Sequence, residues 1–289
     1  MLRRVAILPT LTLLGACSGP IGLGTDIVWS TDFETGSFLP WTQPPGIGGS
    51  YATDGGPTFA SVAPSQDYAH SGRYSAKFTS TASNLTPPIP GTDGAGLFKE
   101  APFPQGAYYS AWYYIPKFHQ TTSDWIILKF KVPSIVDAGP DAADSTVNLD
   151  GSAPADEVAA GTALTELLDL NLVSLPPDTT GMALFLLDSR HQYLTAPLPD
   201  PVAYVKIGQW FQIECFYNNV ATPDGEFIVW LDGKEVYDIH RPMSSQPWVY
   251  FTPCSLVDDL APSDATLYID DVAVSWSRVT PHGILKVPN

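Results

Sequence analysis

Apolar and polar residues alternate along most of the chain with the two-residue period of a β-strand, in segments rich in Val, Ile, Tyr, Phe and Trp. Clusters of Gly, Pro, Asn and Asp separate these segments. The best helical candidate, around residues 157–170, is short and ambiguous. The pattern therefore predicts an all-β sandwich or jelly roll. The predicted strands are residues 27–33, 74–81, 107–115, 124–132, 166–174, 181–187, 210–217, 226–231, 235–239 and 266–276.

Three of these strands are predicted to form an antiparallel meander. Gly208 turns the chain into the first strand, and Asp224-Gly225 turns it into the second. Asp232-Gly233 then forms a two-residue hairpin that leads into the third strand.

The segment 134–163 breaks the alternating pattern. It contains Asp and Glu but no Lys, Arg or aromatic residue, and Ala, Gly and Pro recur throughout. Such a segment cannot bury enough apolar surface to offset the entropy lost on ordering, so we expect a disordered insertion. Strands of the same character flank it, which favours an insertion in a hairpin connection over a boundary between two domains.

We expect an export signal at the N-terminus. Arg3 and Arg4 precede a mostly apolar stretch, and Leu14-Gly15-Ala16-Cys17 resembles a bacterial lipobox. The resemblance implies a signal peptide over 1–16, lipidation of Cys17 and a tether over 17–26; the alternative is an ordinary secretory signal with an unrelated cysteine. Ser18 in place of Asp implies the bacterial outer membrane or cell surface, with the lipid as the membrane contact. One domain would then occupy 27–289.

The formal net charge is -16, from 14 Lys+Arg against 30 Asp+Glu. Nucleic acid is therefore not expected as a partner, because phosphate contacts need clustered basic residues. The charge also argues mildly against polyanionic glycans, although one basic cleft could override it.

The remaining cysteines are Cys215 and Cys254. We place the first in a strand and the second in a loop. An exported compartment permits a disulfide between them, and the alternative is two buried thiols.

Three motifs carry a family resemblance: IGQWFQIECFYNN (207–219), GEFIVWLDGKEVYD (225–238) and TLYIDDVAVSW (266–276). In this order they resemble the C-terminal half of concanavalin A-like jelly rolls, and more narrowly the heparin-lyase-like polysaccharide lyase group. The resemblance implies two curved antiparallel sheets with a polysaccharide lying across the concave face. Because these motifs mark strand packing and turns, they specify a fold and not an activity.

Lys129 and Lys131 alternate along the strand 124–132, so both project from one face, which Ile127 and Trp125 are expected to share. The matching strand of heparin-lyase-like enzymes carries Gln-x-His, which this sequence replaces with Lys-Phe-Lys. β-Elimination needs a partner for the uronate carboxylate, a base and an acid, and a lysine could fill the first role or, if desolvated, the second. The alternative is a solvated strand face.

A second candidate cluster is Arg190, His191 and Tyr193. It offers a carboxylate clamp, a base and a phenolic acid, or it is only a polar loop. We consider three hypotheses: a surface lipoprotein that binds polysaccharide, a polysaccharide lyase acting on a uronate polymer, and a structural envelope protein.

Further candidates concern calcium and sugar stacking. In carbohydrate-binding jelly rolls the two termini often pair, which would bring Asp32 and Glu34 to Asp271 around a structural Ca²⁺; the alternative is edge charge and turn capping. Sugar rings stack on exposed aromatic rings, and we expect Trp125 and Tyr113 (or Tyr109) to point outward for this purpose.

Overall fold

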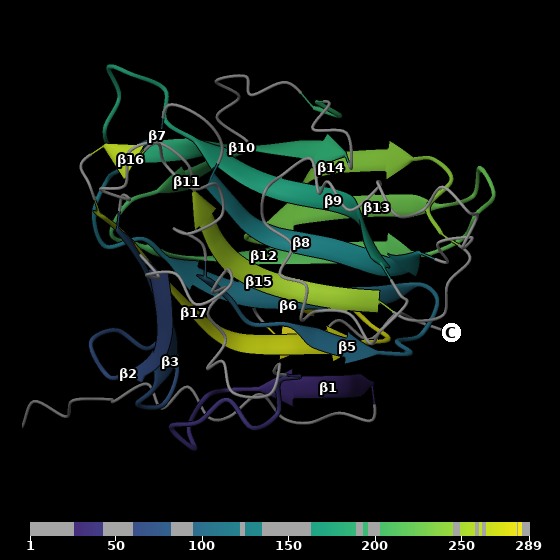
Figure 1. Cartoon of the computed structure of the whole chain (residues 1–289), viewed down its shortest axis with the longest axis horizontal. Coiled ribbons are helices and arrows are strands. Elements are labelled where there is room, and N and C mark those ends of the chain that lie inside the picture. Colours follow the sequence, from purple (N-terminus) through teal and green to yellow (C-terminus); the bar gives the residue numbers. More distant parts are fainter. Residues whose placement is uncertain are drawn as a thin grey trace, which may run out of the picture.

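The computed structural model describes residues 26–42, 60–81, 95–121, 125–134, 163–188, 193–195, 203–244, 249–257, 260–261, 264–281 and 283–284. These residues form strands, turns and loops without any helix. Two large antiparallel sheets pack face to face as a jelly-roll sandwich, as predicted (Figure 1). No helix in this part of the chain is long and apolar enough to cross a membrane.

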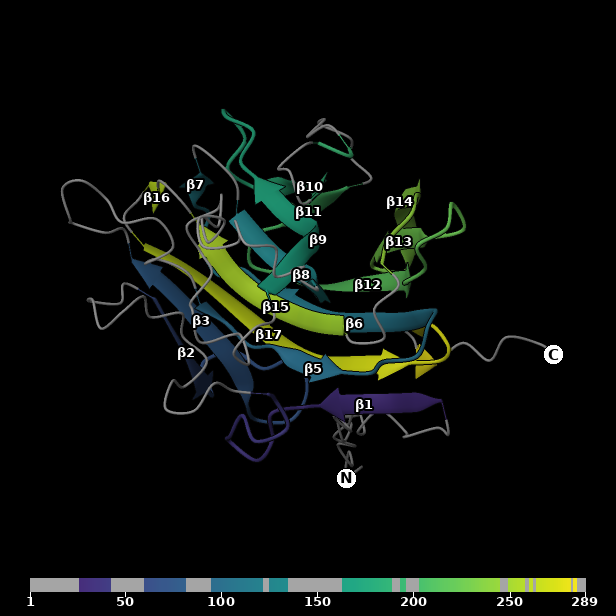
Figure 2. The ribbon, with the colours of Figure 1, turned by 45° about the vertical axis from the view of Figure 1, so that its right-hand side comes forward.

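The eight-stranded sheet has the order β14-β13-β12-β6-β17-β3-β2, and β1 also pairs with β17 (Figure 2). Its strands are β1 (Ile27–Thr31), β2 (Ala60–Ser65), β3 (Ser75–Thr81), β6 (Ala107–Tyr114), β12 (Trp210–Asn218), β13 (Glu226–Leu231), β14 (Lys234–His240) and β17 (Asp264–Ser275). The predicted meander is confirmed as β12–β13–β14. Asp232 and Gly233 both have positive φ, which is what a tight hairpin between right-twisted strands requires.

The seven-stranded sheet has the order β11-β10-β9-β8-β15-β4, and β5 also pairs with β15. Its strands are β4 (Ala95–Gly96), β5 (Lys99–Ala101), β8 (Trp125–Ser134), β9 (Ala163–Val173), β10 (Gly181–Asp188), β11 (Tyr204–Lys206) and β15 (Val249–Val257). Two small pairs complete the fold: β7 (Gln120–Thr121) with β16 (Leu260–Ala261), and β18 (Val279–Thr280) with β19 (Gly283–Ile284).

The core lies between the two sheets. Large side chains from both inner faces fill it, among them Phe78, Tyr109, Phe130 and Phe251. Tyr109 packs against Phe130 and Phe251 with ring centroids 5.0 and 5.1 Å apart, so aromatic contacts join one sheet to the other.

One long strand escaped the sequence prediction. β15 contains Pro253, which cannot donate a ladder hydrogen bond. The structure places Pro253 beside a β-bulge, where the register shifts between Pro253 and Leu256, and a proline is tolerated there. Cys254 therefore lies in a strand and not in the predicted loop.

β8 and β9 are neighbouring antiparallel strands that pair as far as Ser134 and Ala163. The chain between them therefore leaves and re-enters the same sheet at adjacent positions, as expected for an insertion in a hairpin connection. Residues 135–162 themselves lie outside the described residues, as do 1–25 with the predicted signal peptide, Cys17 and most of the tether.

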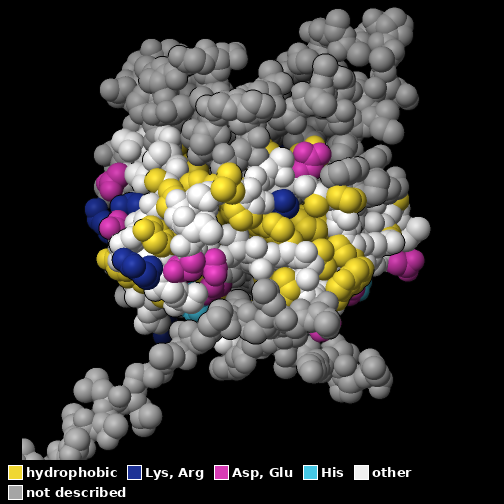
Figure 3. All heavy atoms as spheres, turned by 90° about the horizontal axis from the view of Figure 1, so that it is seen from below, with side chains coloured by type: hydrophobic (Ala, Val, Ile, Leu, Met, Phe, Trp, Pro, Cys, Tyr) yellow, Lys and Arg dark blue, Asp and Glu magenta, His cyan; other side chains and the backbone are white. Residues whose placement is uncertain are grey.

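Figure 3 shows the side of the sandwich that lies at the bottom of Figure 1, where β1 runs. Apolar side chains form a broken band across it, and basic and acidic side chains lie next to each other at one end. Two exposed large apolar residues belong to the β1–β17 region, Val28 and Trp276.

Candidate functional site

Lys129 and Lys131 project from the outer face of the seven-stranded sheet. Leu128 and Phe130 belong to the core, so the alternating lysines point the opposite way. The lysines thus share a face as predicted, but they are 1% and 6% exposed. The alternative of a solvated strand face is therefore wrong, and buried ammonium groups need partners.

Polar residues of the neighbouring strands surround Lys129. Asp169 of β9 lies opposite it on one side and Thr252 of β15 on the other. The Lys129 Nζ and Asp169 Oδ2 atoms are 3.9 Å apart, and both side chains are enclosed. Asn171, two residues further along β9, faces the same way because Leu170 and Leu172 are core residues. We call the side of this sheet that carries Lys129, Lys131, Asp169, Asn171 and Thr252, opposite the core, the lysine face.

Tyr193 extends this row of residues across the sheet. Asp169 pairs with Leu187 of β10, and Leu187 forms a β-bridge with Tyr193. The ring of Tyr193 lies 5.5 Å from that of Phe185, which also faces outward. Three strand spacings of about 4.8 Å separate the Lys129 and Tyr193 backbones, or roughly 14 Å, a span that two long side chains and one sugar ring can bridge. Tyr193 is 60% exposed.

The other two residues of the predicted catalytic cluster, Arg190 and His191, lie outside the described residues. The structure therefore brings together Lys129, Lys131 and Tyr193 on one face.

Trp125 does not join the lysines. The β8–β9 register shifts between Ile126 and Leu128, and this bulge reverses the alternation, so that Trp125 and Ile127 both enter the core. Trp125 is fully buried, and its Nε1 donates a hydrogen bond to Ser255 Oγ at 2.9 Å. The predicted role of Trp125 as an exposed sugar platform is wrong.

Tyr113 is also a core residue. It lies on β6 of the other sheet, and its ring stacks on Phe211 with centroids 5.7 Å apart. Burial raises the pKa of Tyr113 well above its usual value. Tyr109 is buried as well, so neither tyrosine can stack on a glycan. The aromatic residues of β6 that face outward are its even-numbered ones, Trp112 and Tyr114 among them.

The predicted calcium ligands lie where the chain termini pair. Thr31 of β1 is opposite Val272 of β17, which brings Glu34 and Asp271 to the same turn. Glu34 Oε1 accepts hydrogen bonds from the backbone of Arg73 and Tyr74, at 2.7 and 2.8 Å. Asp271 accepts one from Ser71 Oγ at 2.8 Å.

Two further residues define this corner. Asp32 is exposed, and its Oδ1 accepts a hydrogen bond from the backbone N–H of Glu34. Asp32 therefore caps a turn, which was the alternative to calcium binding. Burial, followed by the neighbouring Asp271 carboxylate, raises the pKa of Asp270 to about 8. His70 Nδ1 lies 2.6 Å from Asp271 Oδ2.

Cys215 of β12 and Cys254 of β15 are buried thiols, and no disulfide joins them. Burial raises the pKa of Cys215 well above its usual value. The alternative of two buried thiols thus describes the structure.

Sequence reasoning missed two groups of polar residues. Asp169 and Asn171 interrupt an apolar strand at alternate positions, and this spacing was the available signal. Glu226, Asp238 and His240 gather on the β13–β14 hairpin, which the sequence analysis treated only as a turn motif.

No family model matches this sequence, and no curated protein matches it. Among solved structures, an endo-β-1,4-glucuronan lyase from the fungus Trichoderma reesei is similar over 86% of this chain and 95% of that chain, with a TM-score of 0.53 and 10% identity. The cellulose-induced protein Cip1 is similar over 87% of this chain and 99% of that chain, with a TM-score of 0.51 and 16% identity. The PL7 alginate lyase AlyA1 from Zobellia galactanivorans covers 70% of this chain and 78% of its own, with a TM-score of 0.43 and 8% identity. At these identities the likeness is one of fold, a β-sandwich that occurs among polysaccharide lyases.

Proposed function

We propose that this protein binds an acidic polysaccharide on the lysine face, where Lys129 and Lys131 recognise uronate carboxylates. The observation that carries the proposal is a pair of enclosed lysines on the side of a sheet that points away from the core, in a sandwich similar in fold to a glucuronan lyase. The Lys129 ammonium group already lies 3.9 Å from the Asp169 carboxylate, and a uronate supplies a carboxylate of the same kind. Because both lysines are enclosed, a glycan reaches them only if this face opens on binding.

Affinity electrophoresis in gels that contain alginate, pectate or neutral dextran tests the proposal. We expect the uronate polymers to retard the full chain and dextran to leave it unaffected. Lys131→Gln should weaken the retardation by about tenfold or more, since it removes a desolvated charge partner. The matched control is Lys206→Gln, at an exposed lysine of β11. Equal retardation of wild type and Lys131→Gln, both shown to be folded by thermal unfolding, would contradict the proposal.

A second candidate function is β-elimination on the same face. The observation in its favour is the register that places exposed Tyr193 in one row with Lys129. In this reaction Lys129 would bind the uronate carboxylate while the Tyr193 oxygen takes the C5 proton as general base. The C4–O bond then breaks, a C4=C5 double bond forms, and the phenol returns the proton to the leaving oxygen.

Absorbance of the unsaturated uronate product tests this candidate on glucuronan, alginate, pectate, hyaluronan and heparin. Tyr193→Phe keeps the ring against Phe185 and removes the hydroxyl. We expect absorbance to rise with the wild type on one of these polymers and not with the variant. If no polymer gives a product, elimination is rejected for these substrates, while binding keeps its own electrophoretic test.

We also propose a structural Ca²⁺ held by Glu34 and Asp271. The support is the pairing of β1 with β17, which brings both carboxylates to the turn 70–74, and oxygen ligands suit this ion. Asp32, which is exposed, is left out of the ligand set. Added Ca²⁺ should raise the melting temperature of the wild type and not that of Asp271→Asn. An equal response of both proteins would count against the site.

Anchoring through a lipid on Cys17 likewise remains a proposal, supported by the lipobox-like sequence alone. Expressed in a bacterium with its complete N-terminus, Cys17→Ser should move from the membrane fraction to the soluble fraction. Retention of the variant in the membrane fraction would contradict a lipid anchor at this residue.

A further inference from the structure

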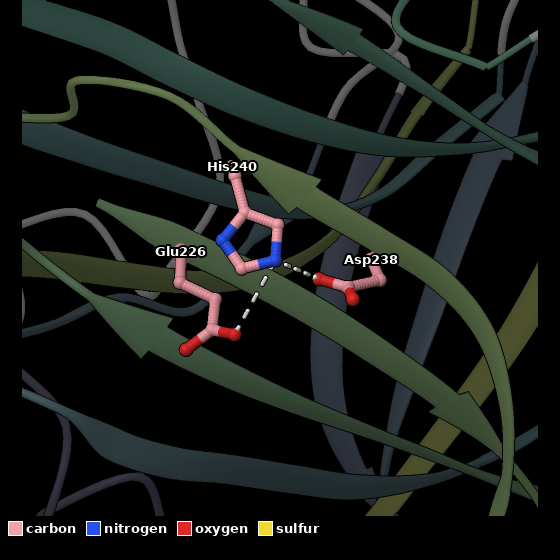
Figure 4. Close-up of side chains that lie close together, drawn as sticks. All are labelled: Glu226, Asp238 and His240. Atoms are coloured by element: carbon pink, nitrogen blue, oxygen red, sulfur yellow. Dashed lines mark ion pairs between the residues drawn. The ribbon is translucent and has the colours of Figure 1, made fainter. Parts of the chain in front are cut away.

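The hairpin at the edge of the eight-stranded sheet carries three potential metal ligands on one face. Glu226 of β13 lies directly opposite His240 of β14. Asp238 precedes His240 by two residues, and the two-residue period of a strand therefore points both side chains the same way. Figure 4 shows the two carboxylates on either side of the His240 ring, both directed at the same nitrogen.

The ligand atoms are spaced as a metal would need. His240 Nε2 lies 3.0 Å from Asp238 Oδ1 and 3.7 Å from Glu226 Oε1. All three ligand atoms lie within 4.8 Å of one another. In a tetrahedral site with bonds of about 2.1 Å, neighbouring ligand atoms are about 3.4 Å apart, a value that the two observed distances bracket. Small side-chain rotations are thus sufficient to close the set around an ion.

Within the described residues, the two carboxylates of this group share one histidine as their ion-pair partner. In the described part of the chain, the ion pairs of Glu226 and Asp238 are with His240 alone. The adjacent Arg241 pairs instead with Asp188, at 3.4 Å. Even a protonated imidazole would therefore leave two carboxylates with one positive charge, and a divalent cation corrects this deficit.

We propose that Glu226, Asp238 and His240 bind a divalent transition-metal ion of the Zn²⁺ class. One imidazole nitrogen and two carboxylate oxygens form a three-ligand set, and water completes the coordination. The imidazole distinguishes this site from the oxygen-only environment that Ca²⁺ and Mg²⁺ prefer. Because the ligands come from both strands, a bound ion would clip β13 to β14 at the open edge of the sheet.

Isothermal titration of the full chain with ZnCl₂ tests the site, with His240→Ala as the first variant. The histidine side chain is 59% exposed, so its removal should leave the fold intact. We expect one Zn²⁺ equivalent to disappear, or its affinity to fall by about tenfold or more, in His240→Ala and in Glu226→Gln. The matched control is Glu235→Gln, an exposed carboxylate on the same strand, which should bind Zn²⁺ like the wild type.

Nitrogen-15 NMR of the histidine rings identifies the ligand atom. Zn²⁺ should shift the Nε2 resonance of His240, and Ca²⁺ at the same concentration should not. The proposal is overturned if His240→Ala binds as much Zn²⁺ as the wild type, or if the His240 resonances stay unchanged at saturation. A shift caused equally by Ca²⁺ would overturn the assignment to a transition metal. None of these readouts depends on glycan binding or on the Glu34–Asp271 site.

Discussion

The buried pair of Lys129 and Asp169 allows a quantitative test of the lysine face. The two charged groups are 3.9 Å apart and their side chains are 1% and 0% exposed. At an effective dielectric constant of about 20, two unit charges at this distance attract each other by about 4 kcal/mol. Lys129→Met removes the cation and leaves the Asp169 carboxylate in the interior. We expect the free energy of unfolding to fall by about 3–5 kcal/mol.

Urea denaturation measures this loss. With a slope of about 3 kcal/mol per molar urea, the midpoint should fall by roughly 1–1.7 M. The double variant Lys129→Met/Asp169→Leu removes both charges, so it should recover most of the lost stability. Lys206→Met, at an exposed position, should stay within about 0.5 kcal/mol of the wild type.

Two results would refute the reasoning. The first is unfolding of Lys129→Met at the wild-type midpoint, which would mean that the two charges are not buried together. Alternatively, the double variant could be as unstable as the single one, so that the loss arises from packing and not from charge. A double variant that is stable but no longer retarded by alginate would separate the functional role of Lys129 from its structural one.

Three further predictions concern buried residues. We either expected different surroundings for them from the sequence or made no prediction. Trp125→Phe should lower the free energy of unfolding by about 1–3 kcal/mol in urea denaturation, because the hydrogen bond to Ser255 and part of the side-chain volume are lost. Alginate retardation should stay unchanged. A specific loss of retardation would show that Trp125 contacts the ligand. Alkylation in denaturant without reductant, read by mass spectrometry, should label both Cys215 and Cys254, whereas protection of both would reveal a disulfide. His119 is buried, and among the described residues its ring nitrogens have no hydrogen-bond partner. Burial lowers the pKa of His119, so the unfolded chain binds the extra proton and stability falls as pH drops below about 6.5. His119→Phe should show a shallower loss of stability between pH 7 and pH 5 than the wild type, and parallel curves would show that His119 does not carry this dependence.

The strands that the sequence predicted are those in which local pattern and final environment agree. In β12, inward Phe211 and Ile213 alternate with outward Gln212 and Glu214, so a period of two was visible in the sequence. The Asp232-Gly233 turn was equally clear, because few residue pairs adopt two positive φ angles. β15 was missed because its proline is acceptable only at a bulge, and the bulge depends on the partner strand.

The candidate site was predicted only in part, because the effect of each β-bulge and partner strand could not be seen in the sequence. Lys129 and Lys131 share a face because the register shift between Phe130 and Lys131 adds its extra residue to β9 and not to β8. The shift between Ile126 and Leu128 adds a residue to β8 and turns Trp125 into the core. Asp169 and Asn171 were passed over because their significance depends on which strand pairs with β8. Tyr193 was proposed from its residue type, and the register then placed it in the row of Lys129.

The sequence by itself determined the all-β class, the meander, the position of the insertion between two strands and the excess of negative charge. These features follow from local periodicity, turn chemistry and composition, which act between residues that are near in the chain. Only the tertiary structure decided that both lysines are buried with Lys129 beside Asp169, that Trp125 and Tyr113 are core residues, and that Glu226 meets His240. Those outcomes depend on β-bulges and on strand register, which are set by packing between distant segments, and a shift of one residue moves a side chain to the opposite face of its sheet.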